Sequence, residues 1–210
     1  MSFSYKKILN QVPPNYYDWG IKSNLLQMMW HKRKWENLGN LLGNASGKLL
    51  DIGCADGTIT RKIAEDKYKL KVWGVDYYKK AIDYAKSKKS IVSFVCSDAR
   101  KLPFKSGTFE FVICIETLEH ISDNQKVLTE IHRVLKKEGT LIVIQDTDSW
   151  FFNLIWFFWT RWKGKVWKGS HVNCMKPHQL RRFLVRGGFK ILKKRTTHFG
   201  LEVSFKAKKR

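Results

Sequence analysis

The sequence predicts an α/β fold in which a doubly wound, mostly parallel sheet carries helices on both faces. Short apolar runs alternate with stretches of helical periodicity, and a turn of small residues joins the first run to the first helix. Such alternation is typical of parallel strands linked by right-handed crossovers. A chain of 210 residues, 43% of them hydrophobic, is long enough to bury the core of one domain.

We expect this single domain, residues 1–210, to have four parts. They are an N-terminal helical cover (1–44), a ligand-binding core (45–147), an aromatic insert or lid (148–170) and a C-terminal helix with strands (171–210). In the cover, apolar residues recur at roughly helical spacing from Ile21 to Leu42, broken by a basic patch at 31–34, which predicts one or two helices over the ligand end of the sheet. Tyr16 and Tyr17 precede them, with packing as the simpler role and ligand contact as the alternative.

The rest of the chain supplies the strands and their crossover helices. Strands are expected at 49–52, 70–75, 91–96, 109–115 and 140–145, with helices near 58–67, 78–88 and 124–137. The last of these helices has one apolar face, and we expect Lys136, Lys137 and Gly139 to end it. A helix near 177–186 and runs at 189–192 and 199–205 complete the sheet.

The turn after the first strand is suited to close approach by a ligand. Gly53, Ala55 and Gly57 follow an apolar run that contains Asp51, and a helical pattern begins at Thr58. Glycine lets the backbone approach a ligand closely, and the first N–H groups of a helix face whatever lies above the strand. The spacing departs from the Gly-x-Gly-x-x-Gly pattern of dinucleotide sites. If the backbone at Ala55 needs a positive φ, the Cβ of this alanine costs energy there.

The pattern Asp-x-Gly-x-Ala-x-Gly resembles the first motif of class I S-adenosylmethionine-dependent methyltransferases, of the type 11 and ubiquinone/menaquinone kind. Asp76 ends the second predicted strand, about 20 residues beyond the glycine turn, where a ribose-binding acid is expected. Asp98 and Ala99, followed by Leu-Pro-Phe, resemble the family's adenine-binding segment. The resemblance implies a Rossmann-like sheet of seven strands with the last antiparallel, and S-adenosylmethionine as cofactor.

The resemblance also implies which residues bind the cofactor, with Asp51 near its methionine ammonium group. The full set is Asp51, Gly53, Ala55, Gly57, Asp76, Tyr77, Asp98, Ala99 and Glu116.

The segment Glu116-Thr-Leu-Glu119-His120 at the end of the fourth predicted strand resembles the acceptor side of small-molecule methyltransferases. His120 is the best general base by its intrinsic pKa, with Glu119 or Glu116 to orient it. The alternative is that Glu119 and His120 cap the following turn.

A divalent metal is a further hypothesis for the same segment. Glu116, Glu119 and His120 stand at i, i+3 and i+4, and His171 lies downstream. Two carboxylates with imidazole suit magnesium or manganese only moderately. His171, Cys174 and His178 could indicate zinc, although one thiol and two imidazoles are weak evidence.

The aromatic insert is unlike an ordinary loop of a water-soluble enzyme. Residues 150–159 are apolar except for Asn153, and the cations Arg161, Lys163, Lys165 and Lys168 follow. A helix of this length spans about 15 Å, half of a ~30 Å hydrocarbon core, so it cannot cross a bilayer. Its composition is typical of an element lying in a membrane interface. A cover over the substrate or a dimer interface is the alternative.

The chain is strongly basic, with a net charge of +22. Sixteen Lys and Arg residues between Arg161 and Arg210 face one acid, Glu202, which favours phosphates of RNA or anionic lipids. Solubility alone is the simpler reading. The scattered cysteines and the absence of an apolar run after Lys6 and Lys7 predict a cytoplasmic protein, peripheral to the inner face of the membrane.

Together these features predict methyl transfer from S-adenosylmethionine to a hydroxyl or carbon of a lipid-like or small-molecule acceptor at a membrane surface. An RNA methyltransferase and a non-catalytic S-adenosylmethionine-binding protein remain alternatives, because one fold supports several functions.

Overall fold

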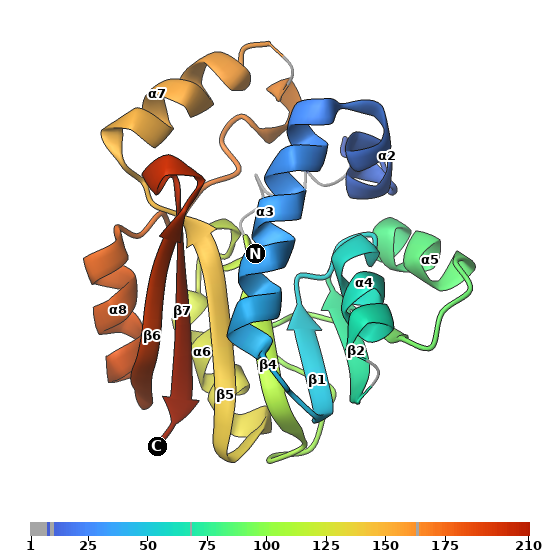
Figure 1. Ribbon diagram of the computed structural model, residues 1–210, viewed down its shortest axis with the longest axis vertical. Helices are drawn as coiled ribbons and strands as arrows, with labels where there is room; N and C mark the ends of the chain where they lie inside the picture. The colour runs from blue at the N-terminus through green and yellow to red at the C-terminus, as the bar shows by residue number, and fades with distance from the viewer. Residues whose placement is uncertain (1–7, 9–10, 68, 163) are drawn as a thin grey trace.

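The computed structural model describes residues 8, 11–67, 69–162 and 164–210. Lys6, Lys7 and Lys163, which the sequence-based predictions used, lie outside these ranges. Within them the chain forms one sheet of seven strands in the order β3-β2-β1-β4-β5-β7-β6 (Figure 1). The strands are β1 (Gly47–Ile52), β2 (Leu70–Asp76), β3 (Ser93–Cys96), β4 (Phe109–Ile115), β5 (Leu135–Asp146), β6 (Phe189–Thr197) and β7 (Glu202–Lys209).

The sheet confirms the predicted doubly wound fold. The strand pairs from β3 through β5 are parallel, whereas β7 runs antiparallel to both of its neighbours, β5 and β6. The strand order reverses between β1 and β4, and in open α/β sheets a ligand binds beyond the strands' carboxyl ends at such a point. The helices are α2 (Tyr16–Ser23), α3 (Leu25–Leu42), α4 (Thr58–Asp66), α5 (Lys79–Ser87), α6 (Asn124–Val134), α7 (Trp150–Trp159) and α8 (Pro177–Arg186).

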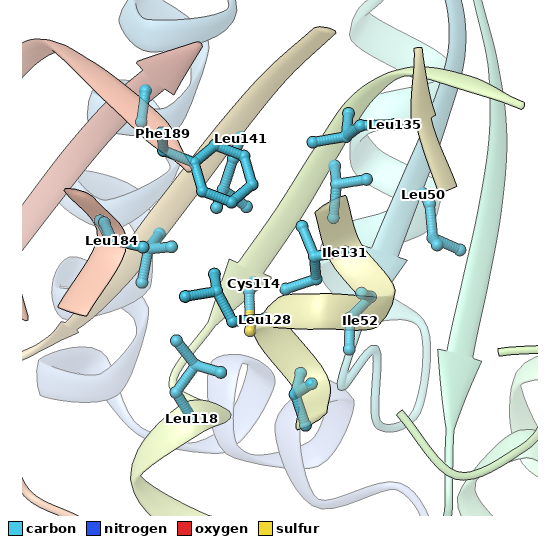
Figure 2. Close-up of a cluster of buried hydrophobic side chains, with 14 of the residues drawn as sticks. Leu50, Ile52, Cys114, Leu118, Leu128, Ile131, Leu135, Leu141, Leu184 and Phe189 are labelled. Atoms are coloured by element: carbon cyan, nitrogen blue, oxygen red, sulfur yellow. The ribbon is translucent and has the colours of Figure 1, made fainter. Parts of the chain in front are cut away.

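Apolar side chains of β1 pack on both faces of the sheet, which explains its almost continuous apolar sequence. Leu49 belongs to an apolar cluster with residues of α3 and α4, whereas Leu50 belongs to a cluster on the opposite face that includes residues of α6 and α8. Figure 2 shows Leu50 and Ile52 of β1 in the cluster that also holds Leu128 of α6 and Leu184 of α8. The two apolar layers fix the sheet and hold the carboxyl ends of its strands in place.

The predicted end of the helix before β5 was wrong. Helix α6 ends at Val134, and Leu135 already pairs with Phe109 on β4, after which the strand register shifts. A Cβ on Gly139 would lie 2.9 Å from the carbonyl oxygen of Lys136. Gly139 therefore permits an irregular strand and does not cap a helix, because pairing with β4 outweighs the local helical pattern.

Part of the positive charge lies on the edge of the sheet. Strand β6 is an outermost strand and carries Lys190, Lys193, Lys194 and Arg195. Charged side chains on an edge strand oppose pairing with another chain. These cations therefore have a structural role that requires no ligand. Among the described helices, none is both long and apolar enough to span a bilayer.

Candidate active site

A cleft opens beyond the carboxyl ends of the central strands, as the strand order predicts. It encloses about 850 Å³ of empty space, part of it open to solvent. The structure brings most of the predicted residues to its wall. Those residues are Gly53, Ala55, Asp76, Tyr77, Asp98, Ala99, Glu116 and His120, joined by Tyr16 and Tyr17.

The glycine loop adopts the left-handed conformation that its sequence suggested. Gly53, Ala55 and Gly57 have φ values of 79°, 46° and 73°. A Cβ on Gly53 would overlap the side chain of Thr117, so only glycine fits there. Ala55 takes the positive φ despite its Cβ, which stores strain next to the cleft. Gly57 precedes α4, and its missing side chain leaves room for Phe94.

Asp76 holds this loop in place. One of its carboxylate oxygens accepts a 2.9 Å hydrogen bond from the Ala55 N–H, and the other accepts a 2.8 Å bond from the Tyr78 N–H. Burial raises the pKa of Asp76 above its ordinary value. A carboxylate oxygen has two lone pairs, so each oxygen can still accept a hydroxyl of a ligand in the cleft.

Asp98 has a partner that the sequence did not reveal. Arg100 donates from Nε and Nη2 to the carboxylate of Asp98, with a shortest contact of 2.6 Å. These bonds hold the pKa of Asp98 below its ordinary value. Asp98 therefore faces the cleft as an ionised, fixed hydrogen-bond acceptor.

Asp51 lies behind the loop, in a smaller adjoining pocket. Its carboxyl accepts a 2.7 Å hydrogen bond from the Thr60 hydroxyl on α4. Burial raises the pKa of Asp51 to about 7. The residue is 3% exposed and lines this second pocket, whereas the main cleft is lined by other residues.

Asp56, which the sequence analysis overlooked, ties the N-terminal cover to the loop. Its buried carboxylate accepts 2.9 Å hydrogen bonds from the N–H groups of Tyr17 and Asp18, at the start of α2. The amino end of a helix carries partial positive charge, which favours such a carboxylate. The sequence held a signal for a role of Asp56 at the site, because this residue stands within the glycine motif itself.

Lys34, the last residue of the basic patch at 31–34, is buried in the structure. Lys34 is 2% exposed and forms ion pairs with Glu116 at the end of β4 and with Glu202, at 3.4 Å, on β7. Burial opposes its charge, but the two carboxylates hold the pKa of Lys34 above its ordinary value. Lys34 likewise holds the pKa of Glu116 low against the effect of burial.

The predicted acid–base pair is arranged differently from the expectation. His120, in the 3₁₀ turn η1 (Leu118–His120), lines the cleft, and its Nδ1 lies 2.9 Å from the Ser170 carbonyl oxygen. A carbonyl only accepts, so Nδ1 carries the proton and Ser170 orients the ring. Burial lowers the pKa of His120. Glu119 is 2% exposed, and neither of its carboxyl oxygens has a hydrogen-bond partner among the described residues.

Within the described ranges, the cluster suited to a metal ion is Glu119, His120 and His171. Glu116 is not in this set, because its carboxylate pairs with Lys34. The predicted combination of His171 with Cys174 and His178 is likewise not gathered in the structure.

Known proteins resemble this chain in sequence and in fold. The methyltransferase domain family matches residues 50–143. The ubiquinone/menaquinone biosynthesis C-methyltransferase UbiE of Campylobacter jejuni is 25% identical, over 97% of this chain and 96% of its own.

The chain belongs to the class I S-adenosylmethionine-dependent methyltransferases.

Two further comparisons agree with this assignment. The ubiquinone biosynthesis O-methyltransferase of Coxiella burnetii is 24% identical over 69% of this methyltransferase and 64% of its own length. Magnesium protoporphyrin IX methyltransferase of Synechocystis, solved with bound S-adenosylhomocysteine, shares the fold with a TM-score of 0.68 at 18% identity, covering 89% of this chain and 88% of that one.

S-adenosylmethionine is the cofactor of this family, and the cleft fits it. Gly53 lines the cleft, and only bare backbone fits there, because its φ is positive and a Cβ would overlap Thr117. Asp76 and Asp98 supply acceptors at the ends of neighbouring strands. The bound cofactor supplies a methyl group on a positively charged sulfur. This sulfur is a good leaving group, so the methyl group can be transferred directly.

Proposed function

We propose that this methyltransferase transfers a methyl group to a hydroxyl or carbon of a lipid-like small molecule at a membrane surface. The observation that carries the proposal is the orientation of α7. Phe152 is buried under the helix, whereas Phe158 is 63% exposed. The exposed apolar set on α7 is Trp150, Phe151, Leu154, Ile155, Phe157 and Phe158.

The inner side of α7 packs next to the cleft. Trp156 and Trp159 of α7 join Trp167 and Tyr16 in one apolar cluster. Tyr16 and Trp167 also line the cleft. In Figure 1, α7 and α2 lie at the end of the molecule to which β1 and β4 point. An apolar acceptor held in a membrane could therefore enter the cleft beside α7.

The charge around α7 suits an anionic surface. Exposed cations follow the helix at Arg161, Lys165 and Lys168, and the guanidinium of Arg161 lies 3.3 Å from the ring centroid of Phe157. Tryptophan and phenylalanine beside cations are typical of interfacial elements. The cysteines are unbridged, which supports a location in the reducing cytoplasm, at the inner face of the membrane.

The relatives support a small-molecule acceptor. Their names refer to ubiquinone, menaquinone and magnesium protoporphyrin IX, which are small molecules and not RNA. We therefore rank RNA below a lipid-like acceptor.

We also propose roles for the residues of the cleft. Asp76 would bind the ribose, Asp98 and Ala99 the adenine, and the loop of Gly53 and Ala55 the methionine part of the cofactor. Tyr77, Gly57, Asp51 and Glu116 would shape or support this site. His120 would then meet the acceptor, because its neutral ring can take a proton from a hydroxyl.

The test is transfer of labelled methyl from S-adenosylmethionine into an extract of the source cells, separated into lipid, RNA, protein and small-molecule fractions. We expect label in the lipid fraction, and we expect Asp76→Ala to lower it strongly when S-adenosylmethionine is below saturation. Label in RNA would contradict the proposed acceptor. Cofactor binding without label in any fraction would favour a non-catalytic binding protein.

A further inference from the structure

The exposed side of α3 is apolar where this helix begins. Leu25, Met28 and Met29 stand at i, i+3 and i+4, so they share one side of the helix. Leu25 is 66% and Met29 56% exposed, whereas Leu38, later in the same helix, is buried. Trp19 on α2 is also exposed. Exposed apolar residues that gather in this way mark interaction sites. We call Trp19, Leu25, Met28 and Met29 the corner patch, because α2 and α3 meet there.

The corner patch is held next to the cleft. Tyr16 and Tyr17 of α2 line the cleft, and the N–H of Tyr17 donates to Asp56 in the glycine loop. The rings of Tyr17 and His31 meet edge to face with their centroids 5.6 Å apart, which fixes α2 against α3. In Figure 1, α2 and the start of α3 lie at the same end of the molecule as α7. The cleft therefore has an exposed apolar surface on α7 and a second one on the corner patch.

Cations follow the apolar residues along α3. Lys32 and Arg33 stand three and four residues after Met29, on the same side of the helix, and both are exposed. They lie about 4.5–6 Å farther along the helix axis. This offset suits a membrane interface, where apolar side chains enter the acyl boundary and lysine or arginine stays at the headgroups. The acid of this helix, Glu36, stands a further turn along.

A strained turn adds an exposed aromatic ring beside these cations. In η3 (His198–Gly200), between β6 and β7, His198 and Phe199 have φ values of 51° and 55°, which residues with a Cβ rarely adopt. The turn is held on α3, because Nε2 of His198 lies 3.0 Å from the carbonyl oxygen of Trp30. Phe199 is exposed, and the guanidinium of Arg33 lies 5.1 Å from its ring centroid. Backbone strain of this kind often accompanies a functional role.

We propose that the corner patch enters the same anionic bilayer as α7, so that the methyltransferase binds the membrane through two separate elements beside its cleft. The inference rests on the proposed membrane location and adds a contact that α7 does not supply. The net charge of +22 favours an anionic lipid surface over a second copy of this chain, because like charges repel. A single interfacial helix leaves the molecule free to rotate about that helix. Two contacts fix its orientation and strengthen binding, because the second contact forms within the bound molecule.

The test is binding of the full chain to vesicles of phosphatidylcholine and phosphatidylglycerol, measured by co-sedimentation at fixed salt. We expect the corner variant, Leu25→Gln with Met29→Gln, to bind at least tenfold more weakly, because two apolar side chains no longer enter the interface. The matched control, Ile91→Gln with Leu192→Gln, also removes two exposed apolar side chains and should bind like the original. Ile91 precedes β3, at the end of the sheet opposite the cleft.

The outcomes separate this inference from the proposed function. If the corner variant binds like the original whereas Leu154→Gln with Phe158→Gln on α7 binds weakly, the corner contact is overturned and the proposed function stands. If the original chain does not bind the vesicles, both fail. Sedimentation velocity without vesicles tests the other occupant. A dimer of the original chain that the corner variant abolishes would assign the patch to a second copy and overturn the inference.

A second measurement uses the original chain and does not depend on a variant being folded. Vesicles that carry a lipid with a photoactivated carbene group deep in its acyl chain label the parts of a protein that enter the hydrocarbon. Trypsin then yields peptide 23–32 from the start of α3, peptide 138–161 with α7, and peptide 90–100 with Ile91. We expect label in the first two peptides and none above background in the third. Label in 138–161 without label in 23–32, or equal label in all three, would overturn the corner contact.

Discussion

At the scale of single residues, Asp76 connects the glycine loop to the end of β2. We predict that Asp76→Ala weakens the binding of S-adenosylhomocysteine about 10- to 100-fold, because hydrogen bonds to a charged group contribute roughly 1.5–3 kcal/mol. Calorimetry measures the change. The control is Asp83→Ala, an aspartate of α5 whose side chain is 55% exposed and whose loss should leave affinity unchanged. Equal affinity in all three proteins would remove Asp76 from the cofactor site.

Because Asp51 is buried, we predict that the stability of the protein depends on pH in an unusual way. The pKa of Asp51 in the folded protein, about 7, lies above the ordinary value of 3.8, so its contribution to folding stability is fully present below about pH 4 and is lost as the pH rises through 7. Asp51→Asn removes this loss, and Asn can still accept from Thr60. We expect the variant to gain about 2–3 kcal/mol relative to the original between pH 5 and pH 8.

Urea denaturation of the cofactor-free protein at pH 5 and pH 8 measures this gain. Asp83→Asn, in the exposed Lys79–Asp83 pair, is the control and should shift stability little between the two pH values. A difference between Asp51→Asn and the original that stays constant with pH would show that Asp51 is ionised throughout.

At the scale of elements, helix α7 has two apolar sides with different roles: one side packs next to the cleft, and the other is exposed. We predict that Leu154→Gln with Phe158→Gln lowers binding to vesicles containing anionic lipid at least tenfold, because each exposed side chain that enters the interface contributes about 1.5–3 kcal/mol. Leu192→Gln is the control, since Leu192 is 49% exposed on β6. Co-sedimentation at fixed salt measures binding. The same loss in the control, or no loss in either, would contradict the interfacial role.

The elements were predicted well where local sequence and tertiary contacts agree. The helix at 177–186 begins at a proline and ends before two glycines, and the structure gives it the same limits. The helix before β5 was predicted three residues too long, because the pairing of Leu135 with Phe109 depends on a strand far away in the sequence. Helical periodicity alone contains no information about that partner.

At the scale of the whole molecule, the sequence motifs predicted which residues line the site. They did not predict the contacts between residues that are distant along the chain. The glycine loop, Asp76 and Asp98 each follow a strand in the sequence, so spacing locates them. The pairing of Asp56 with α2 and the burial of Lys34 join segments that are distant along the chain. A lysine within a run of basic residues looks exposed until the fold places two carboxylates against it.

Lys34 joins the N-terminal cover, the cleft and the C-terminal hairpin through Glu116 and Glu202. We predict that Lys34→Met lowers the free energy of unfolding by about 3–5 kcal/mol, because it leaves the buried carboxylate of Glu202 and the partly buried carboxylate of Glu116 without this cation. Urea denaturation measures the loss. The control is Lys32→Met, an exposed lysine on the same helix, for which we expect less than about 0.5 kcal/mol.

A second substitution separates lost charge pairing from lost packing. Adding Glu202→Gln to Lys34→Met removes one of the unpaired carboxylates, so part of the stability should return. We expect both variants to bind S-adenosylhomocysteine more weakly than the original protein, because Glu116 at the cleft lacks Lys34 in each of them. If the double variant is less stable than Lys34→Met by the full cost of Glu202→Gln alone, the two residues do not interact. The buried lysine would then stabilise the fold by packing, and the cover helix would be held on the sheet by its apolar face.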